Sequence, residues 1–476
     1  MGAGPVGENI ADRAVQGGLS VAIVECELVG GECSYWACMP TKALLRPAHA
    51  LAAARRVPGA REAIIGDLDV DAAFAFRDGA AAQWDDSGQV GWLEGADITL
   101  VRGHGRLAGE RTVEVERDGG RVTLTARHAV AVATGSVPVV PDVPGLATAS
   151  PWTNREAIST SSVPTRLAVI GGGVVASEFA TMFAALGSDV TVLVRGDGLL
   201  GSLEPFAGER VAAALTEAGA DVRTGTSATE VVRAAATGPA TLTLTDGSTL
   251  EVDEILVATG RRPTTDDIGL DTVGLESGQT LTTDDTLRVL GPDHAPIAWL
   301  YAVGDVNGRA LLTHQGKYQA RAAGDVIAAR ATGATVDDGP WGAHVATADH
   351  AAVPSVVFTD PEVATVGLTA ERARAEHRPV RVVDYDLGWI AGATVLAEDY
   401  QGQARFVVDT ERHVVLGVTF VGQDVAELLQ AATVAVVGEV PLHRLWHAVP
   451  AYPTLGEIWL RLLETLGRDT ATAPTS

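Results

Sequence analysis

Cys33 and Cys38 flank the segment Ser-Tyr-Trp-Ala and precede Met-Pro-Thr-Lys. Four intervening residues at the start of a helix can bring two sulfur atoms within bonding distance, and the N-terminal end of a helix favours the thiolate form. The spacing therefore predicts a redox-active pair. Two buried structural cysteines are the alternative that the spacing leaves open.

The sequence contains one further cysteine, Cys26. Three thiols cannot build a disulfide-stapled secreted scaffold, and they cannot complete a four-cysteine zinc site. The chemistry of the cysteines is therefore expected to be local, and no metal site is predicted.

A glycine motif, Gly2-Ala-Gly4-Pro-Val-Gly7, precedes the cysteine pair and opens a predicted helix that ends near Gln16. The apolar strand that follows ends in Glu25. Glycines let the backbone approach a diphosphate at a helix N-terminus, and a carboxylate about 20 residues later can bind a ribose hydroxyl. This segment predicts half of a dinucleotide-binding unit.

The same pattern recurs in the middle of the chain. Gly171-Gly-Gly173-Val-Val-Ala176 lies between predicted strands at 166–170 and 189–194. Two other apolar strands end in Ala-Thr-Gly, at Gly135 and Gly260. The repetition predicts two dinucleotide-binding lobes, each closed by one Ala-Thr-Gly strand.

The amino-acid composition limits the classes of partner that the protein is expected to bind. The 476 residues are expected to form about three domains of ~150 residues each. The 60 acidic and 35 basic residues give a net charge of −25, which argues against nucleic-acid and anionic-membrane surfaces. No apolar run approaches the ~20 residues that span a bilayer, and no signal peptide is recognisable. We expect a cytoplasmic protein with a small-molecule partner.

Several blocks of the sequence together resemble one family. They are the N-terminal glycine motif, residues 30–42 around the cysteines, both Ala-Thr-Gly motifs, and the segments 301–305 and 358–367. In these blocks the chain is similar to the class I pyridine nucleotide-disulfide oxidoreductases, the flavoprotein disulfide reductases, over nearly its whole length. The resemblance implies an α/β fold with two Rossmann-like domains and a C-terminal α+β dimerisation domain.

The resemblance also implies a reaction. Reduced nicotinamide would pass hydride to FAD, the flavin would reduce the disulfide through Cys38, and Cys33 would be the exchange thiol. Lys42 and Glu178 match the ion pair that the family places beside the flavin, although either could be an ordinary surface charge. The predicted cofactor-binding residues are Gly2, Gly4, Gly7, Glu25, Lys42, Gly105, Thr134, Gly135, Ser136, Gly171, Gly173, Ala176, Glu178, Arg195, Gly260, Asp305 and Thr313.

Three of these assignments are specific. Asp305 is expected to bind the ribityl chain of the flavin, Gly105 to lie by its adenine, and Thr313 to begin the helix whose end faces the pyrimidine. For the nicotinamide cofactor, the strand that ends at Val194 lacks the carboxylate typical of NAD enzymes, and Arg195 suits a 2′-phosphate. The sequence favours NADPH over NADH, unless Arg195 is simply a solvated charge.

The C-terminus departs from the family pattern. Where the family carries a His-Pro-Thr-x-x-Glu segment donated by the partner subunit, this chain has Tyr452 and Glu457. A phenol with a pKa of about 10 is a poor base but can donate a hydrogen bond. We still expect a homodimer with Tyr452 and Glu457 at the acceptor site, but an acceptor other than lipoamide or glutathione disulfide.

The N-terminus departs as well, because the strand that should precede the glycine motif is absent from the sequence. Its loss is expected to expose neighbouring strand edges and to weaken FAD binding. A natural start upstream of Met1 is the interpretation that we favour.

The predicted boundaries are 1–147 and 271–345 for the FAD-binding parts, 148–270 for the NAD(P)-binding domain, 346–470 for the dimerisation domain, and 471–476 for a tail. Two other functions stay open. One is a flavin that reduces a quinone or a metal ion directly, with accessory cysteines. The other is an FAD-deficient, non-catalytic nucleotide-binding protein.

Overall fold

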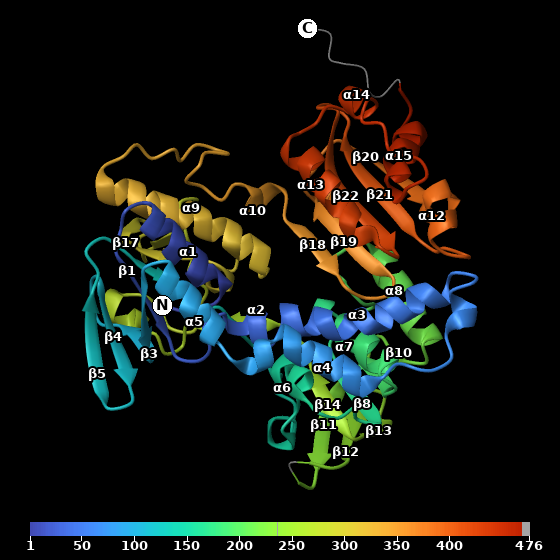
Figure 1. Ribbon diagram of the computed structural model, residues 1–476, viewed down its shortest axis with the longest axis horizontal. Helices are drawn as coiled ribbons and strands as arrows, with labels where there is room; N and C mark the ends of the chain where they lie inside the picture. Colours follow the sequence, from blue (N-terminus) through green and yellow to red (C-terminus); the bar gives the residue numbers. More distant parts are fainter. Residues whose placement is uncertain (236, 469–476) are drawn as a thin grey trace. The chain divides into compact units, whose positions relative to one another are not determined.

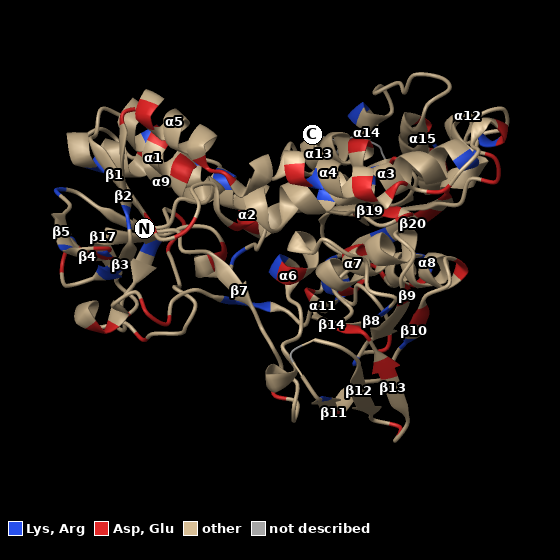
Figure 2. Ribbon diagram, turned by 60° about the horizontal axis from the view of Figure 1, so that its bottom comes forward, with Lys and Arg blue, Asp and Glu red and all other residues tan. Residues whose placement is uncertain are grey.

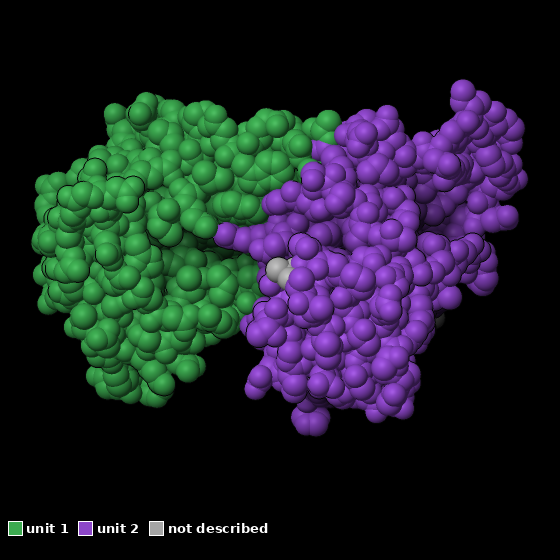
Figure 3. All heavy atoms as spheres, turned by 90° about the horizontal axis from the view of Figure 1, so that it is seen from below, with its two compact units in different colours: residues 1–41, 75–138, 261–350 green, residues 42–74, 139–260, 351–476 purple. Residues whose placement is uncertain are grey.

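The computed structural model describes residues 1–235 and 237–468, so the tail predicted at 471–476 lies outside the described residues (Figure 1). The chain forms two compact units (Figure 3). Unit 1 contains residues 1–41, 75–138 and 261–350, and unit 2 contains residues 42–74, 139–260 and 351–476. Each unit therefore collects three stretches that are distant in the sequence.

Unit 1 is built from small sheets and the helices that cover them. Its sheets have the strand orders β1-β2, β16-β17-β6, β3-β4-β5 and β15-β7. The strands are β1 (Val21–Glu25), β2 (Ile98–Arg102), β3 (His104–Leu107), β4 (Thr112–Arg117), β5 (Gly120–Thr125), β6 (Val130–Val132), β7 (Ser136–Pro138), β15 (Arg261–Pro263), β16 (Arg288–Leu290) and β17 (Pro296–Ala302). The helices wholly inside this unit are α1 (Pro5–Gln16), α2 (Gly31–Tyr35), α5 (Ser87–Gly95) and α9 (Thr313–Thr332).

The first residues of the chain lie between two of these sheets. The amide of Gly2 donates to the carbonyl of Val24 in β1 at 2.8 Å, and the amide of Ala133 donates to the carbonyl of Met1 at 2.8 Å. Met1 and Gly2 thus occupy the place where the end of the absent strand is expected. Part of each neighbouring edge is paired in this way, which limits the exposure expected from the sequence.

Helices α1 and α9 pack side by side and run in the same direction (Figure 1). Small residues allow the contact: a Cβ on Gly316 would lie 2.6 Å from Val6, and a Cβ on Gly324 would lie 2.5 Å from the Cβ of Arg13. The guanidinium of Arg13 also donates to both carboxylate oxygens of Asp325, at 2.8 and 2.9 Å. Both helix N-termini therefore lie at the same end of this pair.

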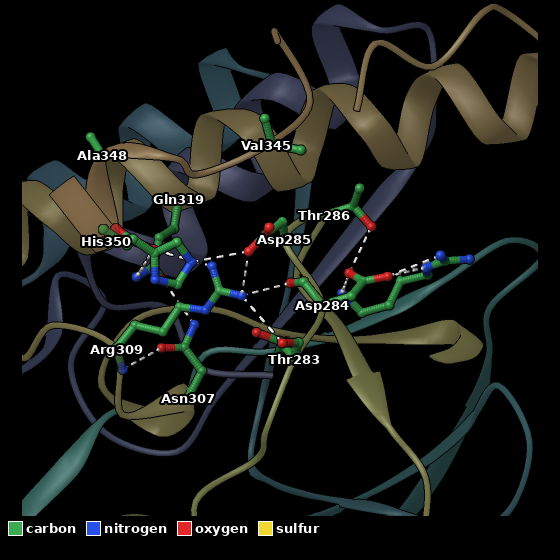
Figure 4. Close-up of polar contacts among 12 residues, drawn as sticks. Thr283, Asp284, Asp285, Thr286, Asn307, Arg309, Gln319, Val345, Ala348 and His350 are labelled. Carbon is green, nitrogen blue, oxygen red and sulfur yellow. Dashed lines mark hydrogen bonds and ion pairs between the residues drawn. The ribbon is translucent and has the colours of Figure 1, made fainter. Parts of the chain in front are cut away.

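A polar network in unit 1 fixes the turn before α9 (Figure 4). The guanidinium of Arg309 donates to the carbonyls of Thr283 and Asp284, at 3.2 and 2.8 Å. The side-chain oxygen of Gln319 accepts from the amide of Gly304 at 2.9 Å and from the side chain of Asn307 at 2.8 Å. Because buried polar groups need partners, this network holds residues 304–309 in one conformation.

The described residues of unit 2 form three sheets. A parallel sheet has the order β10-β9-β8-β14, a small antiparallel sheet has the order β11-β12-β13, and a five-stranded antiparallel sheet has the order β18-β19-β22-β21-β20. The strands are β8 (Arg166–Ile170), β9 (Asp189–Leu193), β10 (Asp221–Arg223), β11 (Ala228–Arg233), β12 (Ala240–Leu244), β13 (Thr249–Val252), β14 (Glu254–Val257), β18 (Pro354–Val357), β19 (Glu362–Gly367), β20 (Val380–Asp386), β21 (Gln403–Asp409) and β22 (Val414–Gly422).

The helices of unit 2 cover these sheets. They are α6 (Asn154–Ser159), α7 (Val174–Ala185), α8 (Pro205–Glu217), α11 (Ala370–Ala375), α12 (Ala391–Leu396), α13 (Leu429–Val437), α14 (Leu442–Leu445) and α15 (Ile458–Leu466). Strands β8, β9 and β14 are nearly continuous runs of buried apolar residues, as is typical of a parallel sheet covered on both faces. Three helices, α3 (Cys38–Arg55), α4 (Val70–Ala80) and α10 (Ala348–Ala351), cross a boundary between the units.

One local expectation needs correction. The two cysteines lie in two successive helices, α2 and α3, rather than together at the start of one helix. Elsewhere, residues 305–307 form a separate 3₁₀ turn before α9. Another 3₁₀ turn, Val425–Leu428, precedes α13.

None of the helices in residues 1–235 and 237–468 combines the length and the apolar character that a membrane span requires. Acidic side chains occur on elements of both units, so the negative charge is not confined to one of them (Figure 2).

Candidate active site

The two cysteines predicted to react are in contact in unit 1. Cys33 lies in α2 and Cys38 is the first residue of α3, and both side chains are thiols. A hydrogen bond with the Cys38 thiol, followed by burial, raises the pKa of the Cys33 thiol. The hydrogen bond brings the two side chains together, as a pair that forms and breaks a disulfide requires.

Thr313 connects this pair to α9. Its hydroxyl lies 3.3 Å from the sulfur of Cys38, at the first residue of a helix of 20 residues. The N-terminal end of a helix carries a partial positive charge, which favours an anionic sulfur beside it. Thr313 begins α9 as predicted, and its contact with Cys38 is an addition to that prediction.

The N-terminal glycine motif has the geometry of a diphosphate cradle. A Cβ on Gly2 would lie 2.3 Å from the carbonyl oxygen of Ala133, and a Cβ on Gly7 would lie 2.0 Å from that of Gly2. By contrast, a Cβ on Gly4 would meet nothing closer than the Cα of Gly31, at 3.9 Å. Gly2 and Gly7 thus permit tight chain packing, while Gly4 leaves open space at the N-terminus of α1.

Glu25 ends β1 and folds back over this cradle. Its carboxylate accepts from the amide of Ala3 at 2.7 Å and from the amide of Glu27 at 2.8 Å. These two bonds fix the carboxylate beside the glycine motif, as a ribose-binding acid requires. Gly105 lies in β3, where a Cβ would come within 3.0 Å of Val24.

Asp305 is the acid of a second polar cluster in unit 1. The hydroxyl of Ser136 donates to its carboxylate at 2.6 Å, and the guanidinium of Arg261 donates to the hydroxyl and the carbonyl of Ser136, at 2.8 and 2.7 Å. Burial raises the pKa of Asp305, although Ser136 and Arg261 oppose the shift. A partly desolvated acid of this kind is suited to accept a hydrogen bond from a ligand hydroxyl.

The Ala-Thr-Gly motifs end strands in different units. The hydroxyl of Thr134 donates to the carbonyl of Thr264 at 2.7 Å, which fixes the turn in unit 1. Gly135 and Gly260 have positive φ angles of 71° and 129°, and a Cβ on either would meet no atom within 4 Å. In both turns the backbone at the glycine is therefore not covered by other protein atoms.

The second glycine motif belongs to unit 2. A Cβ on Gly171 would lie 2.2 Å from the carbonyl of Ala258, whereas a Cβ on Gly173 would meet nothing within 4 Å. Ala176 is fully buried in the first turn of α7. Arg195 is exposed just after β9. The geometry repeats that of the N-terminal motif and fits a second dinucleotide.

Lys42 and Glu178 form an ion pair in unit 2. Their N–O distance is 2.7 Å, and the second carboxylate oxygen of Glu178 accepts from the amide of Phe358 at 2.9 Å. The Lys42 ammonium also lies 5.0 Å from the centre of the Phe358 ring. The buried carboxylate of Glu178 thus holds the Lys42 ammonium in one place. The contacts that Phe358 makes with both residues of the pair could not be predicted from the sequence.

Replacing Lys42 by methionine is expected to lower the stability of the protein by about 1–3 kcal/mol, because Glu178 keeps its burial but loses its cation. The urea midpoint measures the effect. The double variant K42M/E178Q should recover part of the loss, and an unchanged midpoint in K42M would contradict a functional pairing of the two charges.

The C-terminal candidates are both in unit 2 and have different surroundings. The side chain of Tyr452 is exposed. Glu457 is buried and accepts from the amides of Gly392 and Thr454, at 3.0 and 3.3 Å. Glu457 therefore fixes the loop that carries Tyr452 against the start of α12.

These features of unit 1 fit a flavin dinucleotide. Gly4 leaves space for a diphosphate, Glu25 is fixed beside it, and Asp305 is a partly desolvated acceptor. Within the described part of the chain, no group of three or more histidine, cysteine or acidic side chains could hold a metal ion.

Comparison with known proteins decides the family. The model of the pyridine nucleotide-disulphide oxidoreductases matches residues 1–331, and that of their dimerisation domain matches residues 353–462. The chain belongs to this family. A mercuric reductase of Shigella flexneri is 32% identical over 98% of this chain and 80% of its own length. A dihydrolipoyl dehydrogenase of Chlamydia muridarum is 30% identical over 96% of this chain and 94% of its own length.

A solved structure supports the fold. The Cu(II) complex of the HOCl-induced flavoprotein disulfide reductase RclA from Escherichia coli superposes with a TM-score of 0.82. It is 22% identical, and the match covers 97% of each chain. The predicted α/β fold with a C-terminal dimerisation domain is confirmed.

Membership of the family also establishes the class of reaction. The chain is an enzyme, a pyridine nucleotide-disulfide oxidoreductase that uses a flavin and NAD(P)H, and the adjacent Cys33 and Cys38 fit this activity.

Proposed function

We propose that this oxidoreductase binds FAD and NADPH and passes two electrons through Cys33 and Cys38 to a small acceptor, as a homodimer. The observation that carries the proposal is the contact of the two thiols beside the first residue of α9, where Cys38 lies 3.3 Å from the Thr313 hydroxyl. The matched dimerisation domain supports the homodimer.

A bound flavin would accept hydride from the nicotinamide and would supply the two electrons that open the disulfide. The residues of the chain would bind and orient this cofactor. Gly4 and the N-terminus of α1 would hold the diphosphate, Glu25 the ribose, and Asp305 a hydroxyl of the ribityl chain. Thr313 and the N-terminus of α9 stabilise negative charge at Cys38, which leaves Cys33 as the thiol that attacks the acceptor.

We assign Lys42, held by Glu178, to the flavin on the basis of the family resemblance. A fixed cation there stabilises the negative charge of the reduced ring. We also propose Tyr452 as a hydrogen-bond donor to the acceptor, since its exposed phenol replaces the imidazole of related enzymes.

Arg195 is expected to select NADPH. Replacing it with alanine should raise the KM for NADPH roughly tenfold to a hundredfold, because one or two charge-assisted hydrogen bonds to the 2′-phosphate are lost. The KM for NADH should change little. Steady-state kinetics with both cofactors measure the effect. Arg210→Ala in α8 removes a guanidinium elsewhere in the same unit and serves as the control. Equal losses with both cofactors would refute the assignment.

The proposal is tested by counting thiols. Purified holoenzyme is oxidised, then reduced anaerobically with one equivalent of NADPH, and alkylated under denaturing conditions. The proposal predicts two new alkylated cysteines per chain, Cys33 and Cys38, identified by peptide mass spectrometry. Flavin reduction without new thiols would favour direct transfer from the flavin to a quinone or metal ion. Colourless protein that binds no added FAD would favour the non-catalytic alternative.

A further inference from the structure

Gln319 is a fully buried glutamine in the second turn of α9, and its side-chain amide bonds with two other segments of unit 1 (Figure 4). Its Oε1 atom accepts from the amide of Gly304 at 2.9 Å and from the side chain of Asn307 at 2.8 Å. Its Nε2 atom donates to the Asp349 carboxylate at 3.0 Å. One side chain therefore joins the turn that contains Asp305 to the segment that contains Asp349.

The direction of each hydrogen bond in this network is set by groups that only donate or only accept. The amide of Gly304 only donates, so the Oε1 atom of Gln319 must face it. The backbone amide of Arg309 donates to the Oδ1 atom of Asn307 at 3.0 Å, which leaves the Nδ2 atom of Asn307 for Gln319. An ionised Asp349 carboxylate only accepts, and it receives the Nε2 atom of Gln319. All of these bonds form in a single orientation of the Gln319 amide.

Asp349 is held in place by further contacts. Its side chain is fully buried, and it accepts from Gln315 at 2.7 Å in addition to the bond from Gln319. The guanidinium of Arg309 lies 3.5 Å from the carboxylate oxygen that Gln319 binds. Because a buried carboxylate requires such partners, these contacts keep Asp349 where it receives the Gln319 amide.

The other end of the Gln319 amide controls the peptide that leads into Asp305. Residues 304–308 form a tight turn that is closed by two backbone hydrogen bonds of 3.0 Å. The carboxylate of Asp305 accepts from the Ser136 hydroxyl at 2.6 Å. The amide of Gly304 is buried, so without Gln319 it would lack an acceptor, and the turn is expected to change conformation to satisfy it. The position of the Asp305 carboxylate therefore depends on Gln319.

We infer that Gln319 is a positioning residue of the flavin site, because it holds the turn that carries Asp305, and that Asp349 sets the orientation of Gln319. The inference rests on the proposed binding of the ribityl chain by Asp305. It makes the oxygen atom at position 319 essential for the turn, while the nitrogen atom serves to bond with Asp349.

Two leucine variants separate this role from a general loss of stability. Gln319→Leu removes the acceptor of Gly304, whereas Gln315→Leu removes a bond to the same carboxylate that does not involve residues 304–309. In apoprotein, hydrogen–deuterium exchange of residues 303–309 should accelerate roughly tenfold or more in Q319L and change little in Q315L. The Kd for FAD, from fluorescence titration, should rise roughly tenfold to a hundredfold in Q319L alone.

The double variant D349N/Q319E tests the orientation. The new carboxylate at position 319 can accept from Gly304, and the new amide at position 349 can donate to this carboxylate and accept from Gln315. The Kd for FAD should return to within about threefold of the wild-type value. This variant decides the question even where Q319L fails to fold, because its failure to bind FAD would contradict the inference.

The remaining outcomes separate the inference from the proposed function. Unchanged exchange and affinity in Q319L, or equal losses in Q315L, would overturn the role of Gln319. Normal FAD affinity in Asp305→Ala would refute the assignment of Asp305 in the proposed function, whereas weak binding in D305A with normal binding in Q319L would refute the inference alone. If the wild type binds no FAD, the proposed function fails, and exchange in Q319L still decides whether Gln319 holds the turn.

Discussion

Replacing Cys33 with serine is expected to lower kcat at least about 1,000-fold with every acceptor that the wild type reduces. The variant keeps Cys38 and its contact with Thr313, but a serine hydroxyl cannot form the disulfide or exchange with an acceptor. Anaerobic stopped-flow measurement should show that the flavin is still reduced by NADPH at a rate within a few-fold of the wild type. The loss should therefore lie in the steps after flavin reduction.

Cys26→Ser is the matched control, since Cys26 is an exposed thiol in the same unit and should be dispensable. Retained turnover in the Cys33 variant with a quinone or a metal ion would show that the flavin reduces that acceptor directly and that the cysteines are accessory.

Replacing Gly4 with alanine should separate flavin binding from folding. The added methyl group meets no protein atom closer than 3.9 Å, and the φ angle of −72° is open to any residue, so the apoprotein should keep its stability. The methyl group would instead enter the space assigned to the diphosphate. We expect flavin affinity to fall by about 1–3 kcal/mol, roughly tenfold to a hundredfold, measured by fluorescence titration of apoprotein.

Gly173→Ala is the control for this variant, because it adds a methyl group to the corresponding open position of the second motif. It should weaken nicotinamide binding and leave flavin content unchanged. Normal flavin affinity in Gly4→Ala would show that the N-terminal motif does not hold the diphosphate.

Much of the fold was predictable because the sequence patterns that indicate its strands and glycine turns are local. The glycine motifs, the apolar strands ending at Glu25, Ile170 and Val257, and the cysteine pair all follow from short sequence patterns with a direct physical cause. The division of the cysteine segment between α2 and α3 was missed, because the spacing of the two cysteines does not show where one helix ends and the next begins.

Other parts of the site depend on contacts distant in sequence. Arg261 contacts Ser136 from 125 positions away, and its place directly after the Ala-Thr-Gly motif is the one available signal. Glu8 is an acid in the first turns of a helix, which ordinarily indicates a solvent-exposed charge that complements the helix dipole. In the folded chain only 8% of its surface is exposed. Charged groups distant in sequence were therefore the least predictable part of the site.

The central claim is that Cys38 and the flavin form one redox unit, and anaerobic titration with NADPH tests it most directly. Addition of one equivalent should produce a long-wavelength absorption band from charge transfer between the Cys38 thiolate and the oxidised flavin, and Cys38→Ser should lack this band. Bleaching of the flavin without any long-wavelength band in the wild type would contradict the account.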